Sequence, residues 1–102
     1  MAKAQIDTSV IVIVVDGTKY ELRPGALTGK IVRKVRETTG RSLQSAMNDL
    51  AEDPDLDSLS IVCYAAALQS RGRADFDKIE SSISYTSDIT IEQVEDEEQG
   101  EV

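Results

Sequence analysis

Histidine and tryptophan are absent from this chain, aromatic residues make up only 4% of it, and it has a single cysteine. Without histidine, the chain lacks the side chain that most often acts as a general base or binds a metal ion. One cysteine cannot form an internal disulfide or a zinc-binding thiolate cluster. These absences argue against an enzyme and against a bound metal or cofactor, and they favour a reducing, cytosolic setting.

Long apolar runs are also missing. No segment reaches the roughly 18 to 20 apolar residues that a membrane-spanning helix needs. The N-terminus has no basic region followed by an apolar one, so we expect neither a membrane segment nor a signal peptide. The chain has 102 residues, 40% of them hydrophobic, which is enough for one domain with a modest aliphatic core.

Basic residues are absent from the C-terminal part of the chain. Residues 1–84 hold 11 basic and 12 acidic residues, a net charge of −1, whereas residues 85–102 hold seven acidic residues and no basic one, a net charge of −7. Because the body is nearly neutral, strong non-specific binding to DNA is not expected, and nucleic acid is an unlikely partner. Residues 95–102 are predicted to form an acidic disordered tail, and residues 1–9 a flexible arm.

Two short segments near the N-terminus have the pattern of a β-hairpin. Residues 10–15 are all β-branched, and the Asp16-Gly17 pair that follows is the strongest short-range hairpin signal. A two-residue turn pairs residue 15 with residue 18, so that the face belonging on the core carries Ile11, Ile13, Val15, Tyr20 and Leu22. The other face carries Val12, Val14, Lys19 and Glu21. This second face is half apolar, so it requires a further strand or a partner.

Four helices are predicted after the hairpin, because each candidate segment has its own start signal. The expected N-cap residues are Thr28, Ser42, Asp55 and Asp75. Gly40 and Gly72 are the expected stops of the first and third helices, and Pro54 ends the second. We therefore expect helices from Thr28 to about Thr39, from Ser42 to Pro54, from Asp55 to Arg71, and from Asp75 onward.

The third of these helices is apolar all the way round between Ile61 and Leu68, so it must be covered on nearly every side. We expect it to be the hub of the fold and a poor candidate for a binding surface. The side chains expected to enclose it come from the other helices: Ile31, Val32 and Val35; Leu43, Met47 and Leu50; Phe76, Ile79 and Ile83.

Residues 85–94 alternate between apolar and polar side chains, with Tyr85, Ile89 and Ile91 on one face, which indicates an edge strand. The sequence thus predicts a single α+β domain over residues 10–84. Its parts are an N-terminal β-hairpin, a compact bundle of about four short helices, this C-terminal strand and the acidic tail. Either residues 85–94 cover the valine face of the hairpin, or that face binds a partner.

Two features suggest chemistry but have simpler explanations. Asp53, Asp55 and Asp57 are spaced like the start of a calcium-binding loop. However, Ser58 stands where that loop needs glycine and Tyr64 where it needs glutamate. Acidic residues at a helix N-terminus explain the cluster better. Cys63 lies among apolar neighbours with no histidine to activate it, which indicates a buried structural residue.

Binding surfaces are therefore the candidate functional sites. The first helix and the turn after it carry a run of basic residues: Lys30, Arg33, Lys34, Arg36 and Arg41. This run is either a solvated helix face or a binding site. As a binding site it would take an acidic partner, nucleic acid, or the acidic tail of this chain or of a neighbour. Ile91 and Val94 interrupt the acidic end, as in a segment that docks weakly. The predicted partner-binding residues are Val12, Val14, Lys30, Arg33, Lys34, Ile91 and Val94.

The order of elements carries a resemblance. A basic helix led by Thr28 ends at Gly40, and Ser42-Leu43 begins a short helix. An acidic break then leads into a helix rich in aliphatic residues and alanine with Tyr64 near its middle, and Asp75-Phe76 opens the last helix. Over about residues 10–84 the chain resembles the tail assembly chaperones of long-tailed bacteriophages and gene transfer agents.

The resemblance implies a non-enzymatic assembly factor that works in the host cytoplasm, has no catalytic residues, and needs no cofactor. Its implied partners are the tape measure protein and the tail tube protein, with self-association as a further option. Such proteins are often made in two lengths through a programmed frameshift, and the acidic end here would suit the short form.

Two alternatives stay open. In a structural virion component, such as a head–tail connector or tail subunit, the valine face of the hairpin would pair between the subunits of a ring. In a small DNA-associated phage regulator, the basic residues between Lys30 and Arg41 would contact the nucleic acid.

Overall fold

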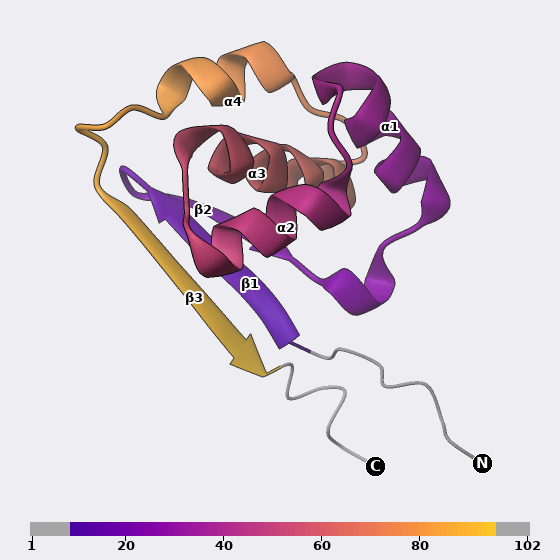
Figure 1. Ribbon diagram of the computed structural model, residues 1–102, viewed down its shortest axis with the longest axis horizontal. Coiled ribbons are helices and arrows are strands. Elements are labelled where there is room, and N and C mark those ends of the chain that lie inside the picture. The colour runs from indigo at the N-terminus through magenta and orange to yellow at the C-terminus, as the bar shows by residue number, and fades with distance from the viewer. Residues whose placement is uncertain (1–8, 96–102) are drawn as a thin grey trace.

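The computed structural model describes residues 9–95, which form a three-stranded antiparallel sheet and four α-helices (Figure 1). This confirms the predicted α+β class. In chain order the elements are β1 (Ser9–Val15), β2 (Thr18–Leu22), a 3₁₀ turn η1 (Pro24–Ala26), α1 (Gly29–Thr39), α2 (Leu43–Glu52), α3 (Leu56–Arg71), α4 (Phe76–Ser82) and β3 (Ile89–Glu95). The predicted arm and acidic tail lie outside the described residues, except for Ser9 and Glu95, which end β1 and β3.

The N-terminal hairpin has the predicted turn and register. Asp16 and Gly17 both have positive φ angles, 49° and 87°, as a two-residue turn matched to the twist of the strands requires. Val15 lies opposite Thr18 and Ile13 opposite Tyr20. The alternation of side chains therefore places Ile13, Val15 and Leu22 in the core, as expected.

The third strand joins the free edge of β1, so the strand order is β2-β1-β3. It begins at Ile89, and the expectation that residues 85–88 belong to it is wrong. Tyr85, predicted to share the inner face, is 93% exposed in a turn. Hydroxyl groups explain the late start, because Ser87 accepts a hydrogen bond from the Ser84 amide and so holds the backbone in a turn. Asp16 then fixes the first pairing, since its carboxylate accepts from the Asp88 amide at 2.9 Å.

All four helices begin where the sequence predicts. The side chains of Thr28, Ser42, Asp55 and Asp75 each accept a hydrogen bond from a backbone amide three residues later. Gly40 and Gly72 end α1 and α3 in the left-handed conformation, with φ angles of 79° and 83°. These caps satisfy backbone groups that the helices cannot pair internally.

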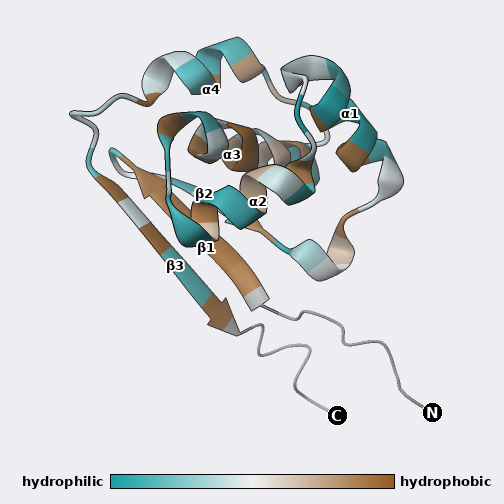
Figure 2. Ribbon diagram, viewed as in Figure 1, coloured by the Kyte–Doolittle hydropathy of each residue, from teal (hydrophilic) through white to brown (hydrophobic). Residues whose placement is uncertain are grey.

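Helix α3 is the centre of the fold, as expected: every residue from Ser58 to Leu68 is buried. It packs on the inner face of β2, and the other three helices pack against it (Figure 1). Figure 2 shows hydrophobic residues concentrated along β1 and α3, with hydrophilic ones on the outer sides of α1 and α2. The prediction is wrong for one of the residues that were expected to cover α3. Val32 is 39% exposed because Ile31 and Val35 already occupy the inward side of α1.

None of the helices in the described part of the chain is both long and apolar enough to cross a membrane.

Candidate protein-binding surfaces

Within residues 9–95 the side chains that could suggest catalysis or metal binding have structural roles. Burial raises the pKa of the Cys63 thiol to about 12, so this cysteine stays protonated and inaccessible at neutral pH. Asp55 caps α3, and hydrogen bonding from Ser58 lowers the pKa of its carboxyl group. No group of three potential metal ligands occurs in this range. The candidate functional sites in this range are therefore binding surfaces.

The first surface is a groove between α2 and the inner face of β3. Helix α3 covers β2, and α2 packs on α3, whereas β3 lies beyond β1 and packs chiefly against it. The inner side of β3 is thus left without a helix across it. The result is a cavity of about 660 Å³, which falls in the usual size range of binding pockets. Its apolar lining consists of Ile11, Pro24, Leu27, Met47, Leu50, Ala51, Pro54 and Ile91.

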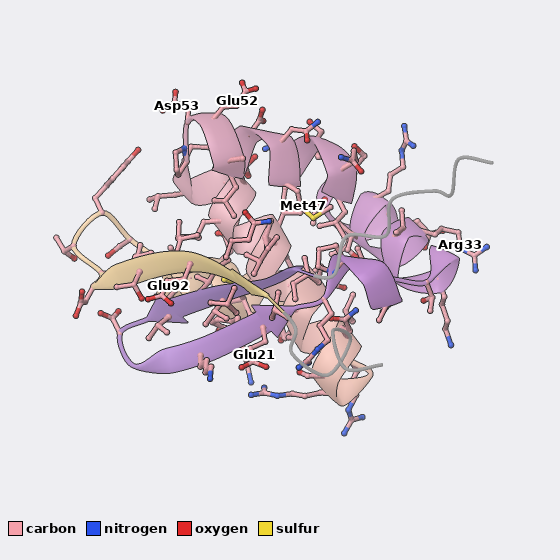
Figure 3. The ribbon with its side chains drawn as sticks, turned by 90° about the horizontal axis from the view of Figure 1, so that it is seen from below. Glu21, Arg33, Met47, Glu52, Asp53 and Glu92 are labelled. Carbon is pink, nitrogen blue, oxygen red and sulfur yellow. The ribbon has the colours of Figure 1, made fainter. Side chains whose placement is uncertain are left out.

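We call this cavity the α2–β3 groove. Ile91 lies opposite Ile13 in the sheet and so points to the helical side, where it is 39% exposed at the groove. Met47 reaches into the space between α2 and the sheet (Figure 3). The polar residues at the groove are Gln44, Asn48, Glu92 and Gln93, and the pairing of Glu92 with Val12 turns the Glu92 side chain to the outer face of the sheet. The groove is therefore lined by apolar side chains together with uncharged amides.

The second surface is the outer face of the sheet, where Val12 and Val14 lie half-buried. Of the two alternatives for this face, coverage by residues 85–94 does not occur. Strand β3 extends the sheet sideways and sets Thr90 and Glu92 beside the two valines, so it widens the face without lying over it. Val94, 42% exposed, also belongs to this outer face. Ile91 and Val94, predicted together as one docking segment, consequently serve opposite faces of the sheet.

The third surface is a basic cleft of about 550 Å³ between α1 and the connection from α3 to α4. The structure brings together three predicted residues, Lys30, Arg33 and Lys34, and adds Arg73, which sequence reasoning missed. The sequence feature that could have identified Arg73 is the Arg-Gly-Arg sequence at the C-cap of α3, where Gly72 turns the chain back toward α1. Apolar side chains line the cleft between the charges: Ile31, Leu68 and Ala74.

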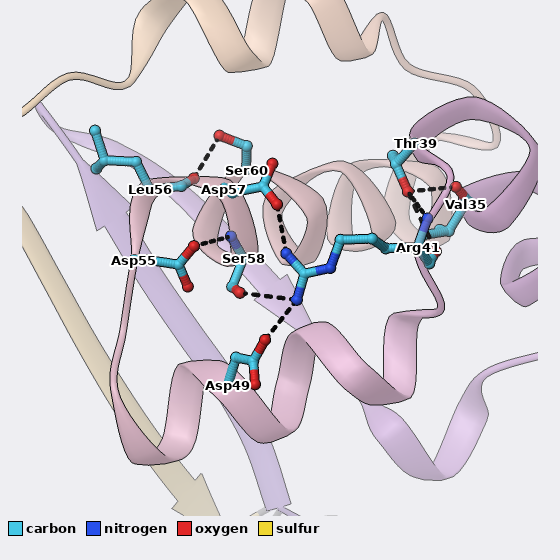
Figure 4. Close-up of polar contacts among 9 residues, drawn as sticks. All are labelled: Val35, Thr39, Arg41, Asp49, Asp55, Leu56, Asp57, Ser58 and Ser60. Carbon is cyan, nitrogen blue, oxygen red and sulfur yellow. Dashed lines mark hydrogen bonds and ion pairs between the residues drawn. The ribbon is translucent and has the colours of Figure 1, made fainter.

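Arg41 does not share this cleft, and its place in the predicted basic cluster is wrong. Its guanidinium group bridges α2 and α3, with Nη2 2.6 Å from Asp49 Oδ2 and Nη1 bonded to Asp57 (Figure 4). Nη2 also donates to the hydroxyl of Ser58. Hydrogen bonding to Asp57 raises the pKa of Arg41 further, so the charge is permanent and engaged in holding two helices together.

Comparisons with family models, with curated protein sequences and with solved structures find no match to this chain.

Proposed function

We propose that this protein is a non-enzymatic tail assembly chaperone of a long-tailed bacteriophage or gene transfer agent, acting in the host cytoplasm. It binds the tape measure protein and helps to recruit tail tube subunits. The observation that carries the proposal is the α2–β3 groove, an open apolar surface on a domain whose candidate catalytic groups are buried or paired.

The shape of the groove favours a helical client. A helix laid along α2 can insert side chains spaced by three and four residues into an apolar groove, which is a recurring mode of peptide recognition. Met47, Leu50 and Ile91 would contact such side chains from both sides of the groove. A tape measure protein is long, helical and apolar on one face, so it presents many segments of this kind. Repeated weak docking would keep that face from aggregating.

The net charge of the chain bears on the solubility of such a complex. The strongly acidic C-terminal part of the chain adds net charge that keeps a chaperone–client complex soluble.

The test is co-expression with the tape measure protein of the same genome, followed by affinity purification of the chaperone. We expect fragments of the tape measure protein to be retained, and Ala51→Arg, which fills the groove from α2, to abolish retention. Ser45→Arg is the matched control, because this exposed position on the same helix does not line the groove. If the unmodified protein retains no tape measure fragment, the proposal is wrong.

A further inference from the structure

The basic cleft concentrates positive charge that few carboxylates offset; its basic residues are Lys30, Arg33, Lys34 and Arg73. None of these four side chains forms an ion pair with a carboxylate within residues 9–95. Glu37 is the one acidic residue in the lining. Three basic side chains elsewhere do form such pairs: Lys19 lies 2.9 Å from Glu21, Arg23 lies 3.8 Å from Glu21, and Arg41 joins two aspartates. An anionic segment in the cleft would relieve the repulsion among the four cations.

The cleft also has features of a peptide site and not only of a charged surface. Ile31 and Ala74 are half-buried and Leu68 is buried, so apolar surface lies beside the cations. An extended segment that mixes carboxylates with an aliphatic side chain would match both parts of the lining. Residues 96–102 of this chain, Asp-Glu-Glu-Gln-Gly-Glu-Val, have that composition, with four acidic residues, one valine and no base.

The topology brings the start of this segment to the correct side of the molecule. Gln93, near the end of β3, and Leu27, just before α1, line the same α2–β3 groove. Thr28, the next residue after Leu27, lines the basic cleft. Figure 1 shows β3 ending beside the start of β1, toward η1. The seven residues beyond Glu95 span at most about 24 Å at roughly 3.4 Å each, so the segment reaches only surfaces near this end of the sheet.

We propose that the basic cleft binds the acidic C-terminal segment, residues 96–102, of the same chain. A short connection gives an attached segment an effective concentration in the millimolar range, so docking within one chain prevails over docking between chains at ordinary protein concentrations. This proposal is independent of the proposed function, since it concerns a different surface and needs no client.

The experiment compares amide NMR spectra of the 102-residue chain with those of a chain that ends at Glu95. At about 50 mM salt we expect shift differences centred on Lys30, Arg33, Lys34, Gly72 and Arg73. At about 500 mM salt, where screening reaches only a few ångströms, we expect these differences to vanish. The synthetic segment 96–102, added to the truncated chain, should reproduce the same shifts.

Charge reversal locates the contact. The double change Arg33→Glu and Lys34→Glu should remove the shift differences and weaken binding of the synthetic segment at least about tenfold. Arg36→Glu is the matched control on the same helix, because Arg36 does not line the cleft, and it should change the affinity less than about threefold. The proposal is overturned if truncation leaves the cleft amides unshifted, if Arg36→Glu is as harmful as the double change, or if the shifts grow with protein concentration.

Discussion

Replacement of Tyr64 tests whether α3 organises the whole fold. Tyr64 is only 2% exposed, its ring meets Phe76 edge-on with the centroids 5.3 Å apart, and its hydroxyl lies 3.2 Å from Thr38 Oγ1. It thus joins α3 to α4 through the ring and to α1 through the hydroxyl group. Two substitutions separate these contributions: Tyr64→Phe removes only the hydrogen bond, whereas Tyr64→Ala removes the ring as well.

The expected costs differ clearly. Tyr64→Phe should lower the free energy of unfolding by about 0.5–1.5 kcal/mol, the usual net value of one hydrogen bond. Tyr64→Ala should lower it by about 3–5 kcal/mol, because a buried aromatic side chain is lost and a cavity remains. A domain of this size is stable by only about 5–15 kcal/mol, so the alanine variant loses a large share of its stability.

Urea denaturation followed by circular dichroism measures both values, and Tyr85→Ala is the matched control. Tyr85 is 93% exposed, so the same substitution there should change the free energy of unfolding by less than about 0.5 kcal/mol. If Tyr64→Ala costs no more than Tyr85→Ala, then α3 is not the hub and the account of the fold fails.

Three further outcomes follow from local contacts. Arg41→Met should cost about 1 kcal/mol in urea denaturation, less at high salt, because it breaks two partly exposed ion pairs; an unchanged midpoint would contradict this. Gly72→Ala should destabilise by about 1–2 kcal/mol, since its φ is 83°, whereas Gly29→Ala should stabilise slightly, although both sites have open space for a methyl group. The pKa of Cys63 is raised to about 12, so its contribution to stability is complete below about pH 9 and declines as pH rises toward 12; Cys63→Ala should flatten this decline in denaturation curves measured across that range.

Local signals in the sequence predicted most of the fold. Asp16-Gly17 defined the turn and, through the period of two in strands, the inward face of the hairpin. Asp55 and Gly72 marked the ends of α3, and its unbroken apolar run correctly placed it at the centre. Each of these predictions depends on residues close together in the chain, where stereochemistry and periodicity are decisive.

The binding surfaces were harder to predict because they depend on contacts between distant segments. The alternation around Ile91 indicates a strand but does not say which edge of the hairpin it joins, and that choice creates the α2–β3 groove. Arg73 joins Lys30 only because a C-cap turn folds back beside α1. Arg41 leaves the basic cluster because Asp57, 16 residues away, captures its guanidinium group.

Two residues of β3 provide the most direct test of the claim that the α2–β3 groove binds the client. Ile91 and Val94 are 39% and 42% exposed but belong to opposite faces of the sheet. Titration calorimetry with a retained tape measure fragment should show that Ile91→Lys weakens binding at least about tenfold, or 1.4 kcal/mol, whereas Val94→Lys changes it less than about twofold. Equal effects, or a loss confined to Val94→Lys, would contradict the account and place the client on the outer face of the sheet.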